Sequence, residues 1–176
     1  MESKVLLSLL MVISILFPCQ RSLAEESRII PLSKLMIRPE AIRLENMAGE
    51  FALSFPVPER HRVRSANLVL DFVYSDALIA TRSQLRIQVN GVTVAQWRLR
   101  PGATHRQESV DIPPELLLSG YNELRFFTAQ HYTDKQCEAP ASPELWTEIN
   151  ALQSRLEFQY DLEPAALSLA KLKWLH

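Results

Sequence analysis

The chain has 176 residues, 47% of them hydrophobic and 22% charged, which is enough for one ordinary globular domain. Its 19 Lys and Arg against 20 Asp and Glu give a net charge of −1, so it lacks the basic excess of proteins that bind nucleic acid or anionic membranes. It has 4 Gly against 11 Pro and neither a GxGxxG nor a GxxxxGK motif, so it also lacks the glycines of a phosphate-binding loop. We expect no nucleic-acid partner and no cofactor.

The first residues are typical of a secretory signal peptide. Residues 5–17 carry no charge, and small residues occupy the third-last and last positions before Glu25. The apolar run is shorter than the roughly 20 residues that a membrane-spanning helix needs, and Pro18 follows it directly. We predict that residues 1–24 are removed on export, with a lipoprotein anchored through Cys19 as a lesser alternative.

Residues 25–40 are expected to form an irregular lead-in, and a strand pattern begins after them. Short runs of apolar, β-branched and aromatic residues recur between turn residues, with a period closer to two than to 3.6. The first three predicted strands are residues 42–45, 50–57 and 66–75. One face of the third strand is wholly apolar and aromatic, and consists of Leu68, Leu70, Phe72 and Tyr74.

The clearest pattern is a β-hairpin over residues 85–99. In its first strand, apolar residues alternate with Arg86, Gln88 and Asn90. The pair Asn90–Gly91 supplies the two residues with positive φ that a type I′ turn requires. The chain then returns as the partner strand.

Further strands are predicted at residues 109–112, 123–130 and 154–162, with two short helical segments between them. Residues 113–120 begin with two prolines and end in glycine, which suits a single helical turn. Residues 144–153 are predicted as a second short helix. Because about seven short strands recur with turns roughly every 8 to 12 residues, we predict an all-β fold, an antiparallel β-sandwich or jelly roll, over residues 41–162.

No arrangement of residues in the sequence points to catalysis. The candidate nucleophiles and metal ligands are His61, His105, His131 and Cys137. Their spacing gives neither a zinc ligand set nor a Cys/His nucleophilic pair, so we predict no catalytic residue and no metal site. A small exported hydrolase that works through carboxylates among Asp134, Glu138 and Glu148 is the competing hypothesis.

Aromatic residues flanked by polar ones suggest contact with a glycan. A sugar ring stacks on an aromatic ring while side chains at the edge bind its hydroxyl groups. The candidate platforms are Trp97, Trp146 and Tyr132, and the candidate hydrogen-bonding partners are Asn90, Gln130 and Asp134. The alternative is that these rings belong to the hydrophobic core.

Six short sequence motifs follow one another along the chain in an order that indicates a protein family. They are SQLRIQVNG at residues 83–91, DIPPELL at 111–117, GYNELRF at 120–126, QHYT at 130–133, CE at 137–138 and LWTEI at 145–149. This series resembles the first domain of the regulatory subunit of bacterial cellulose synthase, the periplasmic B subunit. The resemblance spans about residues 40–162.

The resemblance implies a jelly-roll domain similar to carbohydrate-binding modules, within a noncatalytic subunit. It implies two partners, the membrane-embedded catalytic subunit and the nascent β-1,4-glucan that the subunit guides through the periplasm. Family members also carry the label cyclic di-GMP-binding protein, although the nucleotide is sensed by the catalytic partner. The implied location is the periplasm, at the inner membrane in the full-length family.

The sequence departs from the family pattern after the first domain. The later domains and the membrane anchor of the family do not follow, so we expect residues 163–176 to be a truncated connection to missing domains. A free-standing secreted carbohydrate-binding protein is the alternative, because such a protein needs no anchor.

Overall fold

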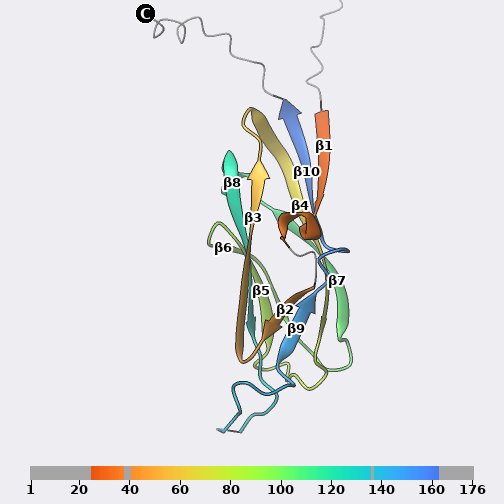
Figure 1. Cartoon of the computed structure of the whole chain (residues 1–176), viewed down its shortest axis with the longest axis vertical. Coiled ribbons are helices and arrows are strands. Elements are labelled where there is room, and N and C mark those ends of the chain that lie inside the picture. Colours follow the sequence, from red (N-terminus) through yellow and green to blue (C-terminus); the bar gives the residue numbers. More distant parts are fainter. Residues whose placement is uncertain (1–24, 38–40, 136, 163–176) are drawn as a thin grey trace, which may run out of the picture.

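Two antiparallel β-sheets pack face to face along the length of the molecule (Figure 1). The computed structural model describes residues 25–37, 41–135 and 137–162. The predicted signal peptide (residues 1–24) and the predicted connection (residues 163–176) lie outside the described residues. The predicted all-β sandwich is confirmed.

Sheet A is built around the longest strand, β4. It contains β1 (Glu25–Pro31), β2 (Ile42–Glu45), β4 (His61–Tyr74), β7 (His105–Ile112), β9 (Trp146–Ile149) and β10 (Arg155–Leu162). One edge of β4 pairs with β7, while the other edge pairs first with β10 and then with β9. β1 and β2 pair in turn with β10 and β9. The described chain therefore begins and ends at the same end of the sandwich, where Glu25 pairs with Asp161.

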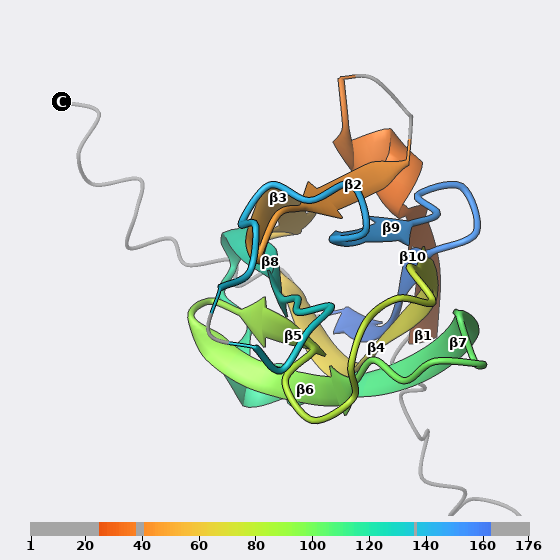
Figure 2. The ribbon, with the colours of Figure 1, turned by 90° about the horizontal axis from the view of Figure 1, so that it is seen from below.

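Sheet B consists of β3 (Ala48–Val57), β8 (Gly120–Ala129), β5 (Gln84–Val89) and β6 (Val92–Arg98), in that spatial order. Viewed along the long axis in Figure 2, β2 lies beside β3 and β6 lies beside β7, so the sheets surround the core. The largest fully buried aromatic side chains between them are Phe55, Phe72, Phe126, Phe158, Tyr74 and Tyr160.

Two local predictions are confirmed in detail. The turn between β5 and β6 has φ of 48° at Asn90 and 81° at Gly91, as the predicted type I′ turn requires. The predicted helical turn after β7 is the 3₁₀ helix η2 (Pro114–Leu116).

Two other predictions are wrong. Residues 25–31 form the edge strand β1 rather than an irregular segment, and the 3₁₀ helix η1 (Leu32–Leu35) follows, with Leu32 fully buried. The predicted helix at residues 144–153 is instead the strand β9, followed by a turn. Leu145, Thr147 and Ile149 are buried alternately, which is the period of a strand and not of a helix.

Gly49 marks a point of close packing between the sheets. A Cβ atom at this position would lie 2.8 Å from both the Leu44 Cβ and the Thr128 Oγ1. We expect Gly49→Ala to lower the free energy of unfolding by about 1.5 kcal/mol, because the Leu44 Cβ sits on the backbone and cannot move aside. Urea denaturation measures this effect. Ser54→Ala, an exposed position in the same strand, is the control, and equal stability of the two variants would contradict the packing account.

Candidate functional site

Gln130, one of the predicted glycan contacts, is fully buried. Its Nε2 donates to the carbonyl oxygens of Leu44 (3.2 Å) and Asn46 (2.8 Å), and its Oε1 accepts a hydrogen bond from the Thr147 hydroxyl (2.8 Å). Both amide hydrogens are thus used inside the domain, and the side chain as a whole joins the end of β2 and the β2–β3 turn to β9. We therefore leave Gln130 out of any ligand surface.

Asn90 also serves the fold. Its Nδ2 donates to the Leu116 carbonyl oxygen (2.7 Å) and to the Asn122 Oδ1 (2.8 Å), and its Oδ1 accepts from the backbone N–H of Glu123 (2.9 Å). These bonds brace the hairpin turn against β8 and η2. Its polar atoms are engaged there, so we leave Asn90 out as well.

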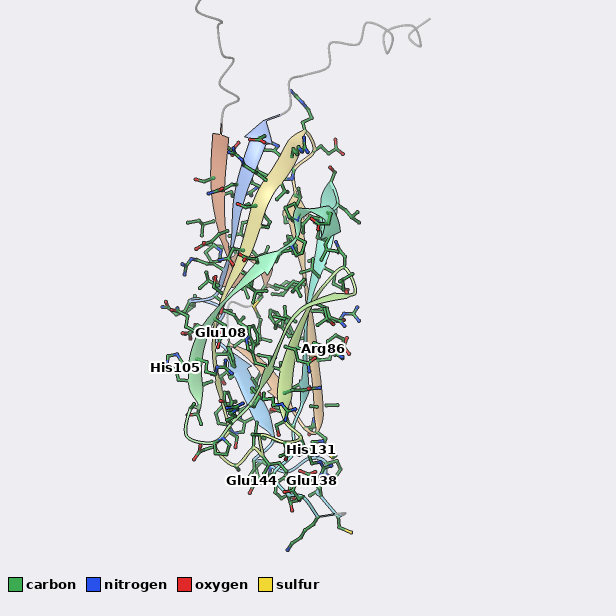
Figure 3. The ribbon with its side chains drawn as sticks, turned by 180° about the vertical axis from the view of Figure 1, so that it is seen from behind. Arg86, His105, Glu108, His131, Glu138 and Glu144 are labelled. Carbon is green, nitrogen blue, oxygen red and sulfur yellow. The ribbon has the colours of Figure 1, made fainter. Side chains whose placement is uncertain are left out.

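Tyr132 and Asp134 lie in the loop between β8 and β9, and Asp134 is exposed. Glu138 organises this loop: its Oε1 accepts from the Tyr132 N–H (2.6 Å), its Oε2 lies 2.6 Å from the His131 Nδ1, and its side chain is 4% exposed. Burial acts to raise the pKa of Glu138, but the hydrogen bonds from His131 and Tyr132, together with the interaction with the Arg82 charge, hold the pKa below its ordinary value. Figure 3 shows His131 and Glu138 together at the end of the sandwich opposite the start of β1 and the end of β10.

Trp97 lies at the side of the sandwich where β6 runs beside β7. Its half-buried ring packs against Phe72, with centroids 5.9 Å apart. It also lines a cleft of about 350 Å³. Trp97 therefore belongs partly to the core, as the alternative expectation held, and partly to a surface cleft.

Trp146 lies on a different surface, the outer face of sheet A. Because Thr147 points into the core, its neighbours Trp146 and Glu148 project outward. The guanidinium carbon of Arg43 lies 4.9 Å from the Trp146 ring centroid, and the Arg43 Nη1 is 3.2 Å from the Glu148 Oε2. Arg43 thus connects the indole ring to the Glu148 carboxylate.

A groove of about 540 Å³ adjoins Glu148 on this face, and we call it the sheet A groove. It is lined by Ala41, Asp71, Val73, His105, Glu148, Asn150, Ala151 and Leu152. The strand pairing sets its floor, since Val73 pairs with His105 on β7 and with Glu148 on β9. Figure 3 shows His105 on the outer side of β7, and its Nε2 is 3.0 Å from the Asp71 Oδ2.

The end of the sheet A groove is fixed by the turn between β9 and β10. The Asn150 N–H donates to the Asp71 carbonyl oxygen (2.9 Å), and the buried Ser154 hydroxyl accepts from the Asp71 N–H (3.0 Å). The Asp71 side chain is 12% exposed, so its carboxylate is held in place and only partly open. The Asn150 Oδ1 already accepts from the N–H groups of Leu152 (3.2 Å) and Gln153 (3.3 Å). The groove therefore combines carboxylate acceptors at Asp71 and Glu148 with apolar surface at Val73 and Leu152.

The six predicted residues thus do not form one site. Only Trp146 lies next to the sheet A groove. The polar residues that line the groove, Asp71, His105, Glu148 and Asn150, were not predicted as glycan contacts from the sequence. The outward position of Asp71 could have been predicted from its strand. The apolar side chains at 68, 70, 72 and 74 face the core, so residue 71 lies on the outer face.

Residues 25–162 match the family model described as cellulose synthase BcsB, first CBM domain. The match covers all of the strands described above. The chain belongs to this family. The predicted resemblance to the cellulose synthase subunit is thereby confirmed, and it extends through β1 to Glu25, beyond the predicted start near residue 40.

Two relatives of this BcsB domain carry the name cyclic di-GMP-binding protein. The protein from Pseudomonas fluorescens is 30% identical over 135 residues, which is 76% of this chain and 17% of the relative. The protein from Xanthomonas axonopodis pv. citri is 32% identical over 114 residues, 64% of this chain and 14% of the relative. The chain thus spans about a sixth of the length of these relatives.

Among solved structures, a family 35 carbohydrate binding module from an environmental isolate aligns with 13% identity and a TM-score of 0.40, over 64% of this chain and 66% of its own. The assignment of the fold rests on the strands themselves and not on this distant likeness. In the described part of the BcsB domain the helical segments are the short η1 and η2, and neither could span a bilayer.

Proposed function

We propose that this domain is a noncatalytic accessory domain of a cellulose synthase complex, which contacts the nascent β-1,4-glucan in the periplasm through the sheet A groove. Membership of the BcsB family supports the place in the complex, with the membrane-embedded catalytic subunit as the protein partner and the inner membrane as the location of the full-length protein. The relatives are named for cyclic di-GMP binding. We propose that the catalytic partner binds this nucleotide, since the present chain has 4 Gly and no glycine-rich phosphate-binding loop.

The observation that carries the glucan contact is the composition of the sheet A groove. A β-glucan presents flat apolar ring faces and hydroxyl groups around their edges. The carboxylates of Asp71 and Glu148 accept hydrogen bonds from hydroxyl groups, and His105 supplies a ring nitrogen. Trp146, held by Arg43 beside Glu148, adds an aromatic surface for the next sugar ring.

Calorimetric titration of the chain with cellohexaose tests this contact. We expect saturable binding that Trp146→Ala and Glu148→Gln each weaken about tenfold, since residues at the centre of a binding surface contribute more than about 1 kcal/mol each. Glu157→Gln is the matched control, because it removes a carboxylate bonded to an arginine of the same sheet, Arg155, but lies outside the groove.

Trp97→Phe is the second control, and it should leave cellohexaose binding unchanged. Absence of saturable binding to the wild-type chain would contradict the glucan contact. Binding that Trp146→Ala leaves unchanged would place the contact elsewhere on the domain and contradict the sheet A groove.

A further inference from the structure

The cleft between β6 and β7 differs from the sheet A groove in charge. We call it the arginine cleft, and its lining consists of Tyr74, Gln96, Trp97, Arg98, Arg100, Ala103 and Arg106. No acidic residue lines it. Three arginines around about 350 Å³ are a local positive excess in a chain whose net charge is −1.

Only one of the three arginines is neutralised within the described residues. Arg106 forms an ion pair with Glu108, and its Nη1 donates to the Arg98 carbonyl oxygen (3.3 Å). The side chains of Arg98 and Arg100 are exposed and have no hydrogen bond or ion pair with any residue in the described part of the chain. The guanidinium groups of these two lining residues are therefore available to an anion.

The backbone that carries Arg100 is fixed before any ligand arrives. The hydroxyl of Tyr74, a residue only 2% exposed, lies 2.6 Å from the Ala103 carbonyl oxygen and accepts from the Arg100 N–H (3.2 Å). The Gly102 N–H donates to the Asp76 Oδ1 (2.6 Å), and Gly102 has φ of 79°. Because the β6–β7 loop is held at both points, binding there would cost little ordering of the backbone.

Trp97 supplies the flat apolar surface of the arginine cleft. Phe72 backs its ring, and the Arg106 guanidinium lies 5.8 Å from the Phe72 ring centroid. Guanidinium groups bind carboxylate and phosphate oxygens with paired hydrogen bonds, and an indole ring packs against a sugar ring. The volume fits a small ligand, and the balanced charge of the chain does not favour a polyanion.

We propose that the arginine cleft binds a sugar ring that carries a carboxylate or a phosphate group. The site does not depend on the proposed glucan contact, because it is lined by other residues on another side of the sandwich. Its ligand also differs in chemistry, since an unsubstituted β-glucan has no charge for Arg98 and Arg100 to bind.

Calorimetric titration of the chain with glucose 6-phosphate, glucuronate, glucose and inorganic phosphate tests this site. We expect glucose 6-phosphate or glucuronate to bind measurably at low ionic strength and glucose not to bind at the same concentration. Arg98→Gln and Arg100→Gln should each weaken the binding about tenfold, and added salt should weaken it further. The matched control is Arg62→Gln, an exposed arginine near the opposite end of β4 from Tyr74, which should leave the affinity unchanged.

The proposal would be overturned by no binding of either anionic sugar, by glucose binding as tightly as glucose 6-phosphate, or by full affinity in both arginine variants. Inorganic phosphate binding as tightly as glucose 6-phosphate would also overturn it, because the sugar ring would then contribute nothing. Cellohexaose should not displace glucose 6-phosphate, so failure of this site and failure of the sheet A groove are distinguishable.

Discussion

Replacing Gln130 by leucine is expected to lower the free energy of unfolding by about 3 kcal/mol. The substitution keeps a side chain of similar size but removes every hydrogen bond that the amide makes. The carbonyl oxygens of Leu44 and Asn46 and the hydroxyl of Thr147 would then lose their bonds to a fully buried residue. Urea denaturation followed by circular dichroism measures the loss.

Gln107→Leu is the matched control for this prediction. Gln107 is exposed on β7, so the same chemical change should alter stability by no more than about 0.5 kcal/mol. If Gln130→Leu were as stable as Gln107→Leu, the buried amide would not be holding the β2–β3 turn against β9.

Glu138→Gln is expected to cost about 2 kcal/mol at neutral pH, because it replaces a carboxylate that accepts two hydrogen bonds. Burial acts against it, but the pKa of Glu138 is lowered in the folded protein by the hydrogen bonds from His131 and Tyr132 and by the Arg82 charge. A carboxylate with a lowered pKa stabilises the fold above its ordinary pKa of about 4.3, and this stabilisation is lost as the pH falls through the folded-state pKa.

The measurement for Glu138 is the difference in unfolding free energy between wild type and Glu138→Gln as a function of pH. It should shrink as the pH falls below about 4.3, the ordinary pKa of a glutamate, and through the lower pKa of the folded state. Glu59→Gln, a glutamate in the exposed β3–β4 turn, is the control and should show no such dependence. A difference that persists unchanged at pH 3 would contradict the role of the carboxylate.

The strands that the sequence predicted well are those with a local signal. The β5–β6 hairpin has strict alternation and an Asn-Gly turn, so its position depends on nothing outside itself. β1 and β9 were missed because their strand character depends on distant partners: β1 pairs with β10, and β9 lies between β2 and β4. Edge strands with polar outer residues such as β1 carry little local pattern.

The candidate site was predictable only in part. Trp146 was suggested by its residue type, but Asp71 and His105 meet only because β4 pairs with β7, which brings together residues 34 apart in sequence. Gln130 could have been recognised as an inward residue, because it continues the alternation of Leu124, Phe126 and Thr128 on the core face of β8. The polar side chain of Gln130 suggested a place on the surface, whereas the alternation of the strand indicated that the residue is buried.

Amide chemical-shift mapping by NMR with cellohexaose tests the central claim most directly, because it locates the ligand without any substitution. The account predicts that the shifted amides cluster on the outer face of sheet A, at residues 71–73, 105 and 146–152, while those of β6 and the β6–β7 loop stay in place. Shifts confined to sheet B or to the arginine cleft, or no shifts at saturating cellohexaose, would contradict it.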